Sequence, residues 1–285
     1  MENLQNVWAV ELELLERFME VCRKYNLQYF ADSGTLLGAV RHNGFIPWDD
    51  DIDLAMPRKD FNRFRKIAKK EFSTPYFVQH GFSDKGYFGG HIHIRNSNTT
   101  AILKTNWPHI KYNQGLFIDV FPLDGDIENK ILHKIQDFNK KLFLSILWLK
   151  FYRKTVSLNL KHILLFPFTI LPQNILFALY ELNARFGNIL PHKNIDVVAY
   201  YGPGAVRNKE WYKEYIEHDF ARTKIRVPKE YDKIMTAQYG SDYMTPKQVS
   251  SDHGETFFDT KNPYTDYLSG KLQIPYEWGK QCLNQ

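Results

Sequence analysis

The acidic run from Asp49 to Asp53, interrupted only by Ile52, constrains this chain more than any other feature. Side chains alternate along a β-strand, so a strand reading DIDLAM places the carboxylates of Asp51 and Asp53 on one face and apolar side chains on the other. Adjacent carboxylates repel each other unless a cation lies between them. Oxygen ligands favour Mg²⁺ or Mn²⁺. The pattern predicts a metal site at Asp51 and Asp53, with Asp49 as a further ligand through water.

A second half of the site is predicted upstream, where Ser33, Gly34 and Thr35 form a small-residue turn before the helix-like stretch TLLGAVRH. Backbone N–H groups at the start of a helix bind phosphate. We therefore expect this turn to hold a phosphate group that faces the metal. Three cationic side chains are further candidates for phosphate contacts, with an ordinary surface role as the alternative: Arg41, Arg95 and Lys104.

The stretch GLFIDVFPLDG predicts a strand in which Asp119 lies among apolar residues. A lone carboxylate there is costly unless it is paired or bound to a metal. Two interpretations follow: either the second face of the strand meets solvent, or Asp119 is a third catalytic carboxylate. In the second case Asp119 is a metal ligand or a general base with a raised pKa. His91 and His93 share one strand face, and His253 lies near the C-terminus, but an ion that prefers oxygen argues against all three as ligands.

Composition narrows the classes of partner. The chain has 285 residues, 44% of them hydrophobic, and a net charge of +5, which indicates a folded protein that suits an anionic partner. No dense Lys/Arg stripe with interleaved aromatics appears, so nucleic acid is not expected. Cys22 and Cys282 show neither metal-ligand nor disulfide spacing, which favours a reducing compartment. The N-terminus does not resemble a leader, and we expect a cytoplasmic location.

The order of elements favours an α+β fold in which a mixed β-sheet is flanked by helices. Helices are expected at 4–25, 57–72 and 228–240 and strands at 27–31, 51–56, 75–80, 87–95 and 115–121, with an extended segment at 241–254. We divide the chain into a catalytic core at 1–126, a helical insertion at 127–200 and a C-terminal part at 201–285 that completes the catalytic domain.

The stretch 127–200 is basic and apolar at once, with ten Lys/Arg against four Asp/Glu. Clusters such as LFLSILWLKFY predict helices with large apolar faces and basic rims. One interpretation is a helical subdomain that packs on the core. The other is an interfacial surface that binds the anionic inner face of a cell membrane as a peripheral protein, because prolines interrupt the apolar run at 162–180.

Three stretches resemble the LicD family of phosphotransferases: DSGTLLGAVRHNGFIPWDDDIDLAMPRKDF at 32–61, QGLFIDVFPLDG at 114–125 and VPKEYDKIMTAQYGSDYMTP at 227–246. The resemblance implies a nucleotidyltransferase-like core and a metal-dependent enzyme. It also implies transfer of phosphocholine from CDP-choline to a hydroxyl of a cell-surface glycan, such as teichoic acid, capsule or lipopolysaccharide, with release of CMP. Acceptors of this family are typically lipid-linked. Fukutin-like relatives carry an anchor and some carry a zinc site; this chain shows neither pattern, which fits a bacterial enzyme.

Several alternatives remain open at this point. The transferred group could be another CDP-activated alcohol of the glycerol, ribitol or aminoethyl type. A nucleotidyltransferase acting on a small molecule would release pyrophosphate instead of CMP. A calcium-binding scaffold is the alternative outside enzymes, although the acidic run lacks the D-x-[DN]-x-[DN]-G spacing of a calcium loop. If the head group is choline, an aromatic cage is expected, for which Trp48, Trp107 and Tyr112 are candidates.

Overall fold

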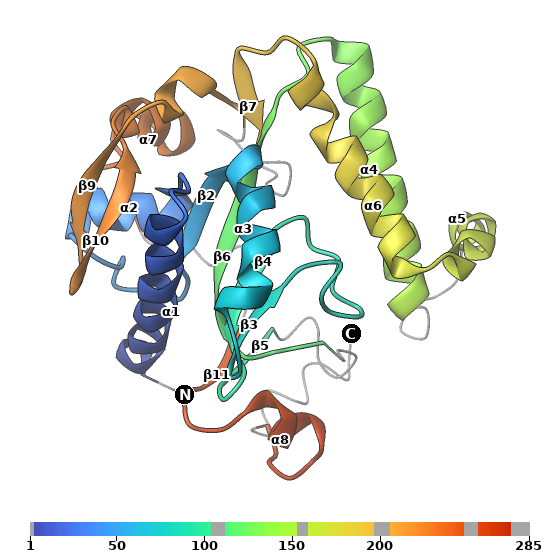
Figure 1. Ribbon diagram of the computed structural model, residues 1–285, viewed down its shortest axis with the longest axis horizontal. Coiled ribbons are helices and arrows are strands. Elements are labelled where there is room, and N and C mark those ends of the chain that lie inside the picture. The colour runs from blue at the N-terminus through green and yellow to red at the C-terminus, as the bar shows by residue number, and fades with distance from the viewer. Residues whose placement is uncertain (1–2, 104–111, 153–158, 197–205, 248–255, 275–285) are drawn as a thin grey trace.

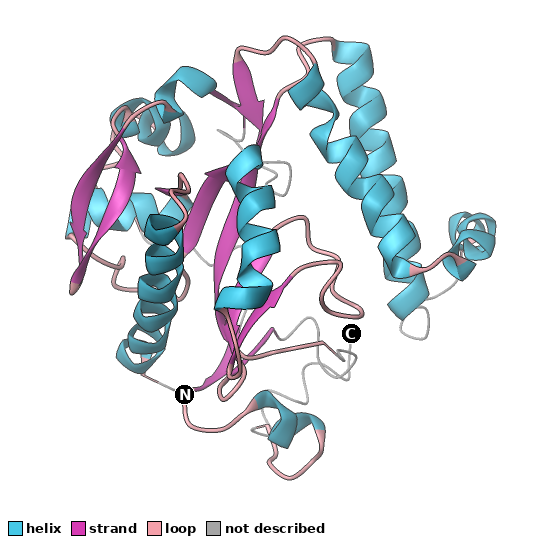
Figure 2. Cartoon of the chain, in the orientation of Figure 1, coloured by secondary structure: helices cyan, strands magenta, loops and turns pink. Residues whose placement is uncertain are grey.

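The computed structural model describes residues 3–103, 112–152, 159–196, 206–247 and 256–274, and its helices and strands are drawn in Figure 1 and Figure 2. The α-helices are α1 (Leu4–Lys24), α2 (Ser33–His42), α3 (Arg58–Glu71), α4 (Lys130–Tyr152), α5 (Leu160–Leu165), α6 (Gln173–Ala184), α7 (Tyr231–Tyr239) and α8 (Tyr264–Leu268). Short 3₁₀ helices are η3 (Phe166–Ile170), η4 (Arg185–Ile189) and η5 (Lys209–Tyr212).

The strands are β1 (Phe30–Ala31), β2 (Asp53–Pro57), β3 (Tyr76–Gln79), β4 (Ile92–Asn96), β5 (Thr100–Leu103), β6 (Leu116–Gly125), β7 (Asn194–Asp196), β8 (Val206–Asn208), β9 (Tyr215–Phe220), β10 (Thr223–Pro228) and β11 (Thr256–Asp259). The main sheet has the order β1-β2-β6-β4-β3, and β7 and β8 extend it from the end of β6. Among the described strands of this sheet, only β2 and β6 run parallel, and the other pairs are antiparallel. The expected α+β fold with a mixed sheet is confirmed.

One face of the sheet is apolar and is covered by helices. Leu54, Ile94 and Ile118 are fully buried on neighbouring strands and belong to the same core as Leu14 and Phe64 of the helices α1 and α3. Figure 1 shows these two helices in front of the sheet. Because side chains alternate along each strand, the residues between these apolar ones point to the opposite face. That opposite face carries the polar residues of the candidate site.

Most expected elements appear with shifted ends. The helices expected at 4–25 and 57–72 are α1 and α3, whereas the one expected at 228–240 begins only at Tyr231. The strand expected at 51–56 begins at Asp53, so the prediction that Asp51 lies in this strand is wrong. The backbone of Asp49 forms hydrogen bonds outside the sheet: its N–H donates to the carbonyl of Ile46, and its carbonyl accepts from Trp8 Nε1 at 2.9 Å.

Another expectation, that 241–254 is extended, is wrong for its described part. Residues 241–247 form turns, in which the N–H of Tyr243 donates to Gly240 and that of Thr245 to Asp242. The helices expected between 127 and 200 are present as α4, α5 and α6, while the boundaries of the three proposed domains stay a prediction.

The α4–α6 region leaves much apolar surface exposed. Its exposed side chains recur at helical intervals in α4 (Ile131, Ile135, Phe138) and in α6 and η4 (Ile175, Leu179, Leu182, Phe186). Within the described residues no one helix is both long and apolar enough to cross a bilayer. The bent pair Leu160–Ile170 and Gln173–Ile189, with 110° between its halves, passes that test together by length and composition.

A buried ionic cluster joins this helical region to the sheet. Arg58 donates through Nε to Asp124 Oδ1 at 2.7 Å, through a second nitrogen to Asp124 Oδ2, and through a third to Glu181 at 3.3 Å. All three side chains are buried, and they come from α3, the end of β6 and α6. Arg65 adds a 2.8 Å contact to Glu181. The cluster therefore positions α6 relative to β6.

We predict that Arg58→Met destabilises the protein by about 3–5 kcal/mol, because it leaves two buried carboxylates without their shared cation. Urea denaturation followed by circular dichroism measures the change. Arg63→Met on the same helix is the matched control: Arg63 is half exposed in its pair with Asp60, and its loss should cost less than about 1 kcal/mol. Equal effects of the two substitutions would contradict the prediction.

Candidate active site

A row of polar side chains crosses the sheet. Asp53 of β2 is the register partner of Asp119 of β6, Asp119 is the partner of His93 of β4, and His93 is the partner of Gln79 of β3. Register partners on adjacent strands lie about 5 Å apart and point to the same face. Asp119 therefore lies beside Asp53, and a strand face turned to solvent is excluded, since the Asp119 side chain is 13% exposed. Its role as a third catalytic carboxylate stays a prediction.

The row continues past β2 to a buried ion pair. The N–H of Asp32 donates to the carbonyl of Asp53 at 3.0 Å, which places Asp32 at the edge of the row. Arg207 donates to Asp32 Oδ1 and to the hydroxyl of Tyr212, and all three side chains are buried. The sequence analysis did not identify Arg207. Arg207 lies 175 residues after Asp32, and no local sequence pattern indicates that the two side chains pair.

The predicted phosphate turn lies directly against the acidic loop. Ser33 has a left-handed backbone, with φ of 46°, at the start of α2. A Cβ on Gly34 would come within 2.5 Å of Asp49 Oδ2, so only glycine fits there without displacing that carboxylate. Thr35 Oγ1 accepts from the N–H of Asp53 at 2.8 Å. Thr35 thus fixes the Asp53 end of the acidic stretch, and Gly34 leaves room for Asp49 at the other end. Contact of Ser33, Gly34 and Thr35 with phosphate stays a prediction.

The acidic loop gathers three carboxylates in front of β2. Ligand atoms of Asp49, Asp50 and Asp51 all lie within 4.8 Å of one another. Asp51 reaches this group from the loop and not from a strand. Its charge nevertheless acts on the row, because burial first, and then the charges of Asp51 and Asp119, raise the pKa of Asp53 well above its usual range. The loop and the row therefore form one negatively charged centre.

Glu11 is a further carboxylate of this centre that the sequence analysis missed. It lies on the buried face of α1, is 1% exposed, and its Oε2 has no hydrogen-bond partner among the described residues. Burial raises its pKa, and the charges of Asp51, Asp50 and Asp49 add to that shift. A signal was present: Glu11 occupies a core position of the amphipathic pattern, four residues after Val7 and four before Leu15.

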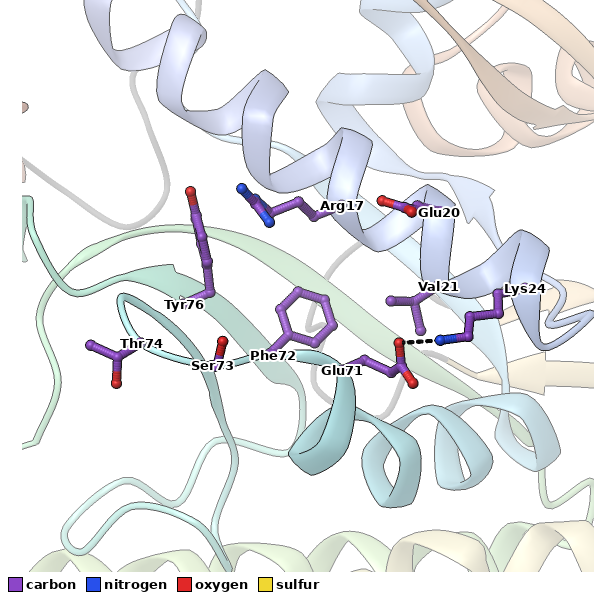
Figure 3. Close-up of a pocket in the computed structure, with 9 residues that line it drawn as sticks. All are labelled: Arg17, Glu20, Val21, Lys24, Glu71, Phe72, Ser73, Thr74 and Tyr76. Carbon is purple, nitrogen blue, oxygen red and sulfur yellow. Dashed lines mark hydrogen bonds and ion pairs between the residues drawn. The ribbon is translucent and has the colours of Figure 1, made fainter.

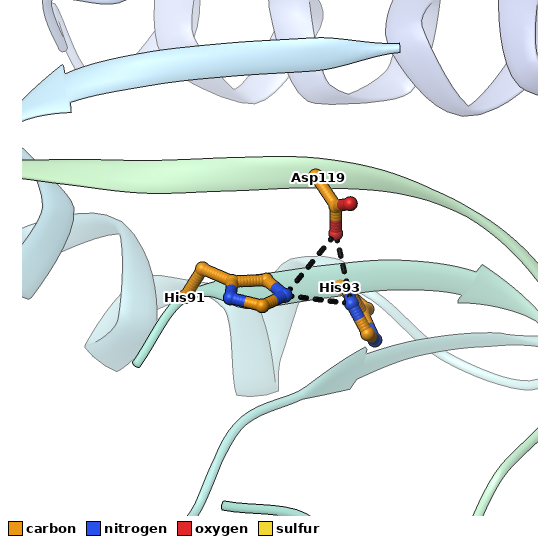
Figure 4. Close-up of side chains that lie close together, drawn as sticks. All are labelled: His91, His93 and Asp119. Carbon is orange, nitrogen blue, oxygen red and sulfur yellow. Dashed lines mark hydrogen bonds and ion pairs between the residues drawn. The ribbon is translucent and has the colours of Figure 1, made fainter. Parts of the chain in front are cut away.

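Two imidazoles meet Asp119 from β4 and the residue before it. His93 Nε2 lies 2.9 Å and His91 Nε2 lies 3.6 Å from Asp119 Oδ1, and the two nitrogens are 2.8 Å apart (Figure 4). Burial lowers the pKa of His91 to about 4, and burial together with Arg95 lowers the pKa of His93 well below its usual range. Both rings are therefore neutral near pH 7.

The predicted phosphate ligands outside the turn are held by protein groups. Arg41 donates to the carbonyl of Tyr243 at 2.8 Å and to His42 at 2.9 Å. Arg95 is buried and donates to Gln79 Oε1 at 2.7 Å and to the carbonyl of Gly115 at 2.6 Å. It lies on the strand face of His93, two residues along. Lys104 lies outside the described residues, as do Trp107 and His253.

The remaining aromatic candidates do not form one cluster in the described structure. Trp48 packs against the main core, and the ring of Tyr112 lies 5.6 Å from that of Tyr87. A separate hollow of about 210 Å³ lies between α1 and the connection from α3 to β3 (Figure 3). It is lined by charged residues such as Arg17 and by the pair of Lys24 and Glu71, and among the described residues that line it none belongs to the acidic centre.

Known proteins resemble the part of the chain that carries this centre. Residues 26–158 match the family described as LicD/FKTN/FKRP, nucleotidyltransferase domain. The chain is 28% identical to the lipopolysaccharide cholinephosphotransferase LicD of Haemophilus influenzae over 254 residues, which cover 85% of this chain and 91% of that protein. It is 26% identical to the human ribitol 5-phosphate transferase FKRP over 87 residues, or 30% of this chain and 18% of that protein.

The matched range contains the acidic loop, Asp53, Asp119 and both histidines. The resemblance found in the motifs is thereby confirmed over the whole stretch from the phosphate turn to β6. Residues 26–158 of this chain are therefore similar to the nucleotidyltransferase domain of the LicD/FKTN/FKRP family.

Proposed function

We propose that this protein is a metal-dependent phosphotransferase that moves phosphocholine from CDP-choline to a hydroxyl of a cell-surface glycan and releases CMP. The proposal depends on one observation: Asp53 and Asp119 are register partners on adjacent strands, next to the carboxylates of the acidic loop and the start of α2. Similarity to a cholinephosphotransferase over nearly its whole length supports the reaction class. The shorter similarity to a ribitol 5-phosphate transferase makes ribitol the second candidate head group.

The residues of the centre fit a divalent cation with oxygen ligands. Asp51, Asp53 and Asp119 would hold Mg²⁺ or Mn²⁺, with Asp49 as an outer ligand. Glu11 supports the fit, because its buried Oε2 lacks a hydrogen-bond partner among the described residues and faces several like charges. Such a group is stable only if it is protonated or lies near a cation. When bound, the ion would neutralise charge on the transferring phosphoryl oxygens and on the leaving CMP.

The protein groups have separate tasks in this proposal. The start of α2 would bind a donor phosphate through backbone N–H groups, and the close contact of Gly34 with Asp49 would keep that phosphate beside the carboxylates. Asp119, between Asp53 and two neutral imidazoles, is placed either to hold the cation or to accept the proton of the acceptor hydroxyl. Thr35 fixes the start of β2 and thereby the position of Asp53.

A panel of CDP-alcohols tests the proposal directly. The protein is incubated with a lipopolysaccharide or lipid-linked glycan acceptor, Mg²⁺ and the CDP derivative of choline, ribitol, glycerol or ethanolamine. We expect CMP release to be fastest with CDP-choline and to depend on the acceptor. Release of pyrophosphate from CTP would indicate a nucleotidyltransferase. Calcium binding without any response to a cytidine nucleotide would indicate a scaffold.

We predict that Asp51→Asn and Asp53→Asn each lower CMP release at least about 100-fold, which corresponds to ~3 kcal/mol of lost electrostatic stabilisation. The substitution keeps the size of the side chain and removes its charge. Asp219→Asn is the matched control, since Asp219 is exposed on β9, far along the chain from the centre. Circular dichroism verifies the fold of each variant. Turnover near that of the wild type in either active-site variant would remove these carboxylates from the centre.

We also predict that stability of the metal-free protein falls as pH rises above the ordinary pKa of a glutamate, ~4.3. The folded state keeps the proton of Glu11 at pH values where the unfolded chain has lost it, because the pKa of Glu11 is raised. The stabilisation is therefore complete below the unfolded pKa and is lost as pH passes the folded pKa. Mg²⁺ should restore stability mainly at the upper end.

Thermal melts across this pH range, with and without Mg²⁺, measure the effect. Glu11→Gln should flatten the pH dependence, whereas Glu20→Gln, on the exposed side of α1, should not change it. A pH dependence that is the same in both variants would show that Glu11 does not titrate as proposed.

We further propose that the α4–α6 region rests on the anionic inner face of a bacterial membrane, where a lipid-linked acceptor would be available. The exposed apolar stripes of α4 and α6 could enter the interface, and exposed Lys130, Lys134 and Lys141 would meet anionic head groups. Each such lysine contributes about 1 kcal/mol near an anionic surface, which suits reversible binding. This location separates binding to the membrane from the chemistry at the sheet.

We predict that the protein sediments with vesicles that contain anionic lipid, and that binding weakens as salt rises, because the screening length falls to ~3 Å at 1 M. The double variant Ile131→Ser/Ile135→Ser should bind less, since both side chains are exposed on α4, at 71% and 49%. Ile216→Ser, at an exposed apolar position of β9, is the control and should bind as the wild type does. Absence of binding at low salt would contradict the membrane contact.

A further inference from the structure

The group formed by His91, His93 and Asp119 has the dimensions of a metal coordination shell. The three ligand atoms lie 2.8, 2.9 and 3.6 Å from one another (Figure 4). Ligands held at about 2.0–2.2 Å from one ion are roughly 2.8–3.1 Å apart in octahedral geometry and roughly 3.3–3.6 Å apart in tetrahedral geometry. One ion therefore fits among these atoms with small side-chain adjustments and no change in the sheet.

Three rigid features bring the ligands together. His91 and His93 are two residues apart at the start of β4, so both rings are on the face of the sheet that carries Asp119. The ring of His91 lies 4.9 Å from that of Phe121, and the ring of His93 lies 4.5 Å from that of Phe117. Because both phenylalanines flank Asp119 on β6, the same strand supplies the carboxylate and the packing that orients the imidazoles.

The outer contacts of His93 suit a metal ligand. Gln79 Oε1 lies 2.8 Å from His93 Nδ1, where it can accept the Nδ1 proton and leave Nε2 for an ion. Arg95 donates to the same Gln79 oxygen, and another of its nitrogens lies 2.7 Å from His93 Nδ1, so this donor must shift when Nδ1 carries the proton. Its charge opposes a cation, but the carboxylates of Asp119 and Asp53 lie in the same row and offset it.

A plain hydrogen-bonded cluster explains these atoms less well. His91 Nδ1 is buried and has no hydrogen-bond partner among the described residues, so hydrogen bonds do not hold the far side of this ring. The two Nε2 atoms lie 2.8 Å apart, so either one ring donates its proton to the other in an N–H···N hydrogen bond or both nitrogens bind one cation.

We propose that His91, His93 and Asp119 bind a divalent transition-metal ion of the Zn²⁺ class, beside the oxygen-ligand centre of Asp51 and Asp53. Imidazole nitrogen selects such ions over Mg²⁺ and Ca²⁺, which prefer all-oxygen sites. The site rests on the proposed function only in that Asp119 belongs to both centres. It implies that a transition metal, bound at micromolar or lower concentration, accompanies the Mg²⁺ chemistry.

The experiment is a titration of the metal-free protein with Co²⁺, whose visible absorption reports nitrogen and oxygen ligation, followed by calorimetry with Zn²⁺. We expect one site per chain whose spectrum is insensitive to millimolar Mg²⁺. His91→Gln and His93→Gln, which keep side-chain bulk, should weaken binding at least about tenfold, and Gln79→Ala, through the outer contact, by about 10-fold to 100-fold. His218→Gln on β9 is the matched control and should bind as the wild type does.

Two further results separate this site from the proposed function. Asp51→Asn should retain the Co²⁺ spectrum while losing CMP release. Equal Co²⁺ affinity in the wild type, His91→Gln and His93→Gln would overturn the site, even if Mg²⁺-dependent CMP release is found. Binding that depends on both histidines, with no reaction of any CDP-alcohol, would support the site and overturn the proposed function. Melting curves verify that each variant is folded.

Discussion

The centre depends on one interaction, the repulsion between the carboxylates of Asp53 and Asp119. The parallel pairing of β2 and β6 places these two carboxylates side by side. Two like charges at register distance, largely removed from water, cannot both be ionised without compensation. On the β1 side, Arg207 neutralises Asp32. On the β4 side, two neutral imidazoles meet Asp119. The charge that remains lies between Asp53, Asp119 and the acidic loop, where a cation would be most stabilised.

The first helix takes part in this arrangement and does more than cover the sheet. Trp8 holds the loop by donating to the carbonyl of Asp49, and Glu11, one turn later, adds a buried carboxylate to the group. Gly34 approaches Asp49 from α2. The loop is therefore in contact with two helices, α1 through the hydrogen bond of Trp8 and α2 through Gly34. A region so restrained is prepared for its ligand, and little conformational entropy remains to be lost on binding.

Local patterns were sufficient to predict the elements that position the site. The alternation in GLFIDVFPLDG predicted β6 and the face of Asp119, and the spacing of apolar residues predicted α1 and α3. The end of the strand at Asp53 was not predictable in the same way, because a turn bond to Ile46 and a tertiary bond from Trp8 keep Asp49 out of the ladder. Arg207 and Glu11 depend on contacts between distant segments. The histidines were set aside because the ion was assumed to be magnesium, and sequence alone does not place them against Asp119.

Strand β6 joins the three parts of the molecule that the proposals concern. Asp119 lies near its middle, in the charged row, and Asp124 lies near its end, where Arg58 joins it to Glu181 of α6. Asn188, just after α6, also donates to Asp124 at 2.6 Å. The helices with exposed apolar stripes are therefore attached by buried ionic contacts to the strand that carries a catalytic candidate. A surface held in this way would present the sheet to a membrane in one orientation, so that a lipid-linked acceptor approaches the charged row from a fixed direction.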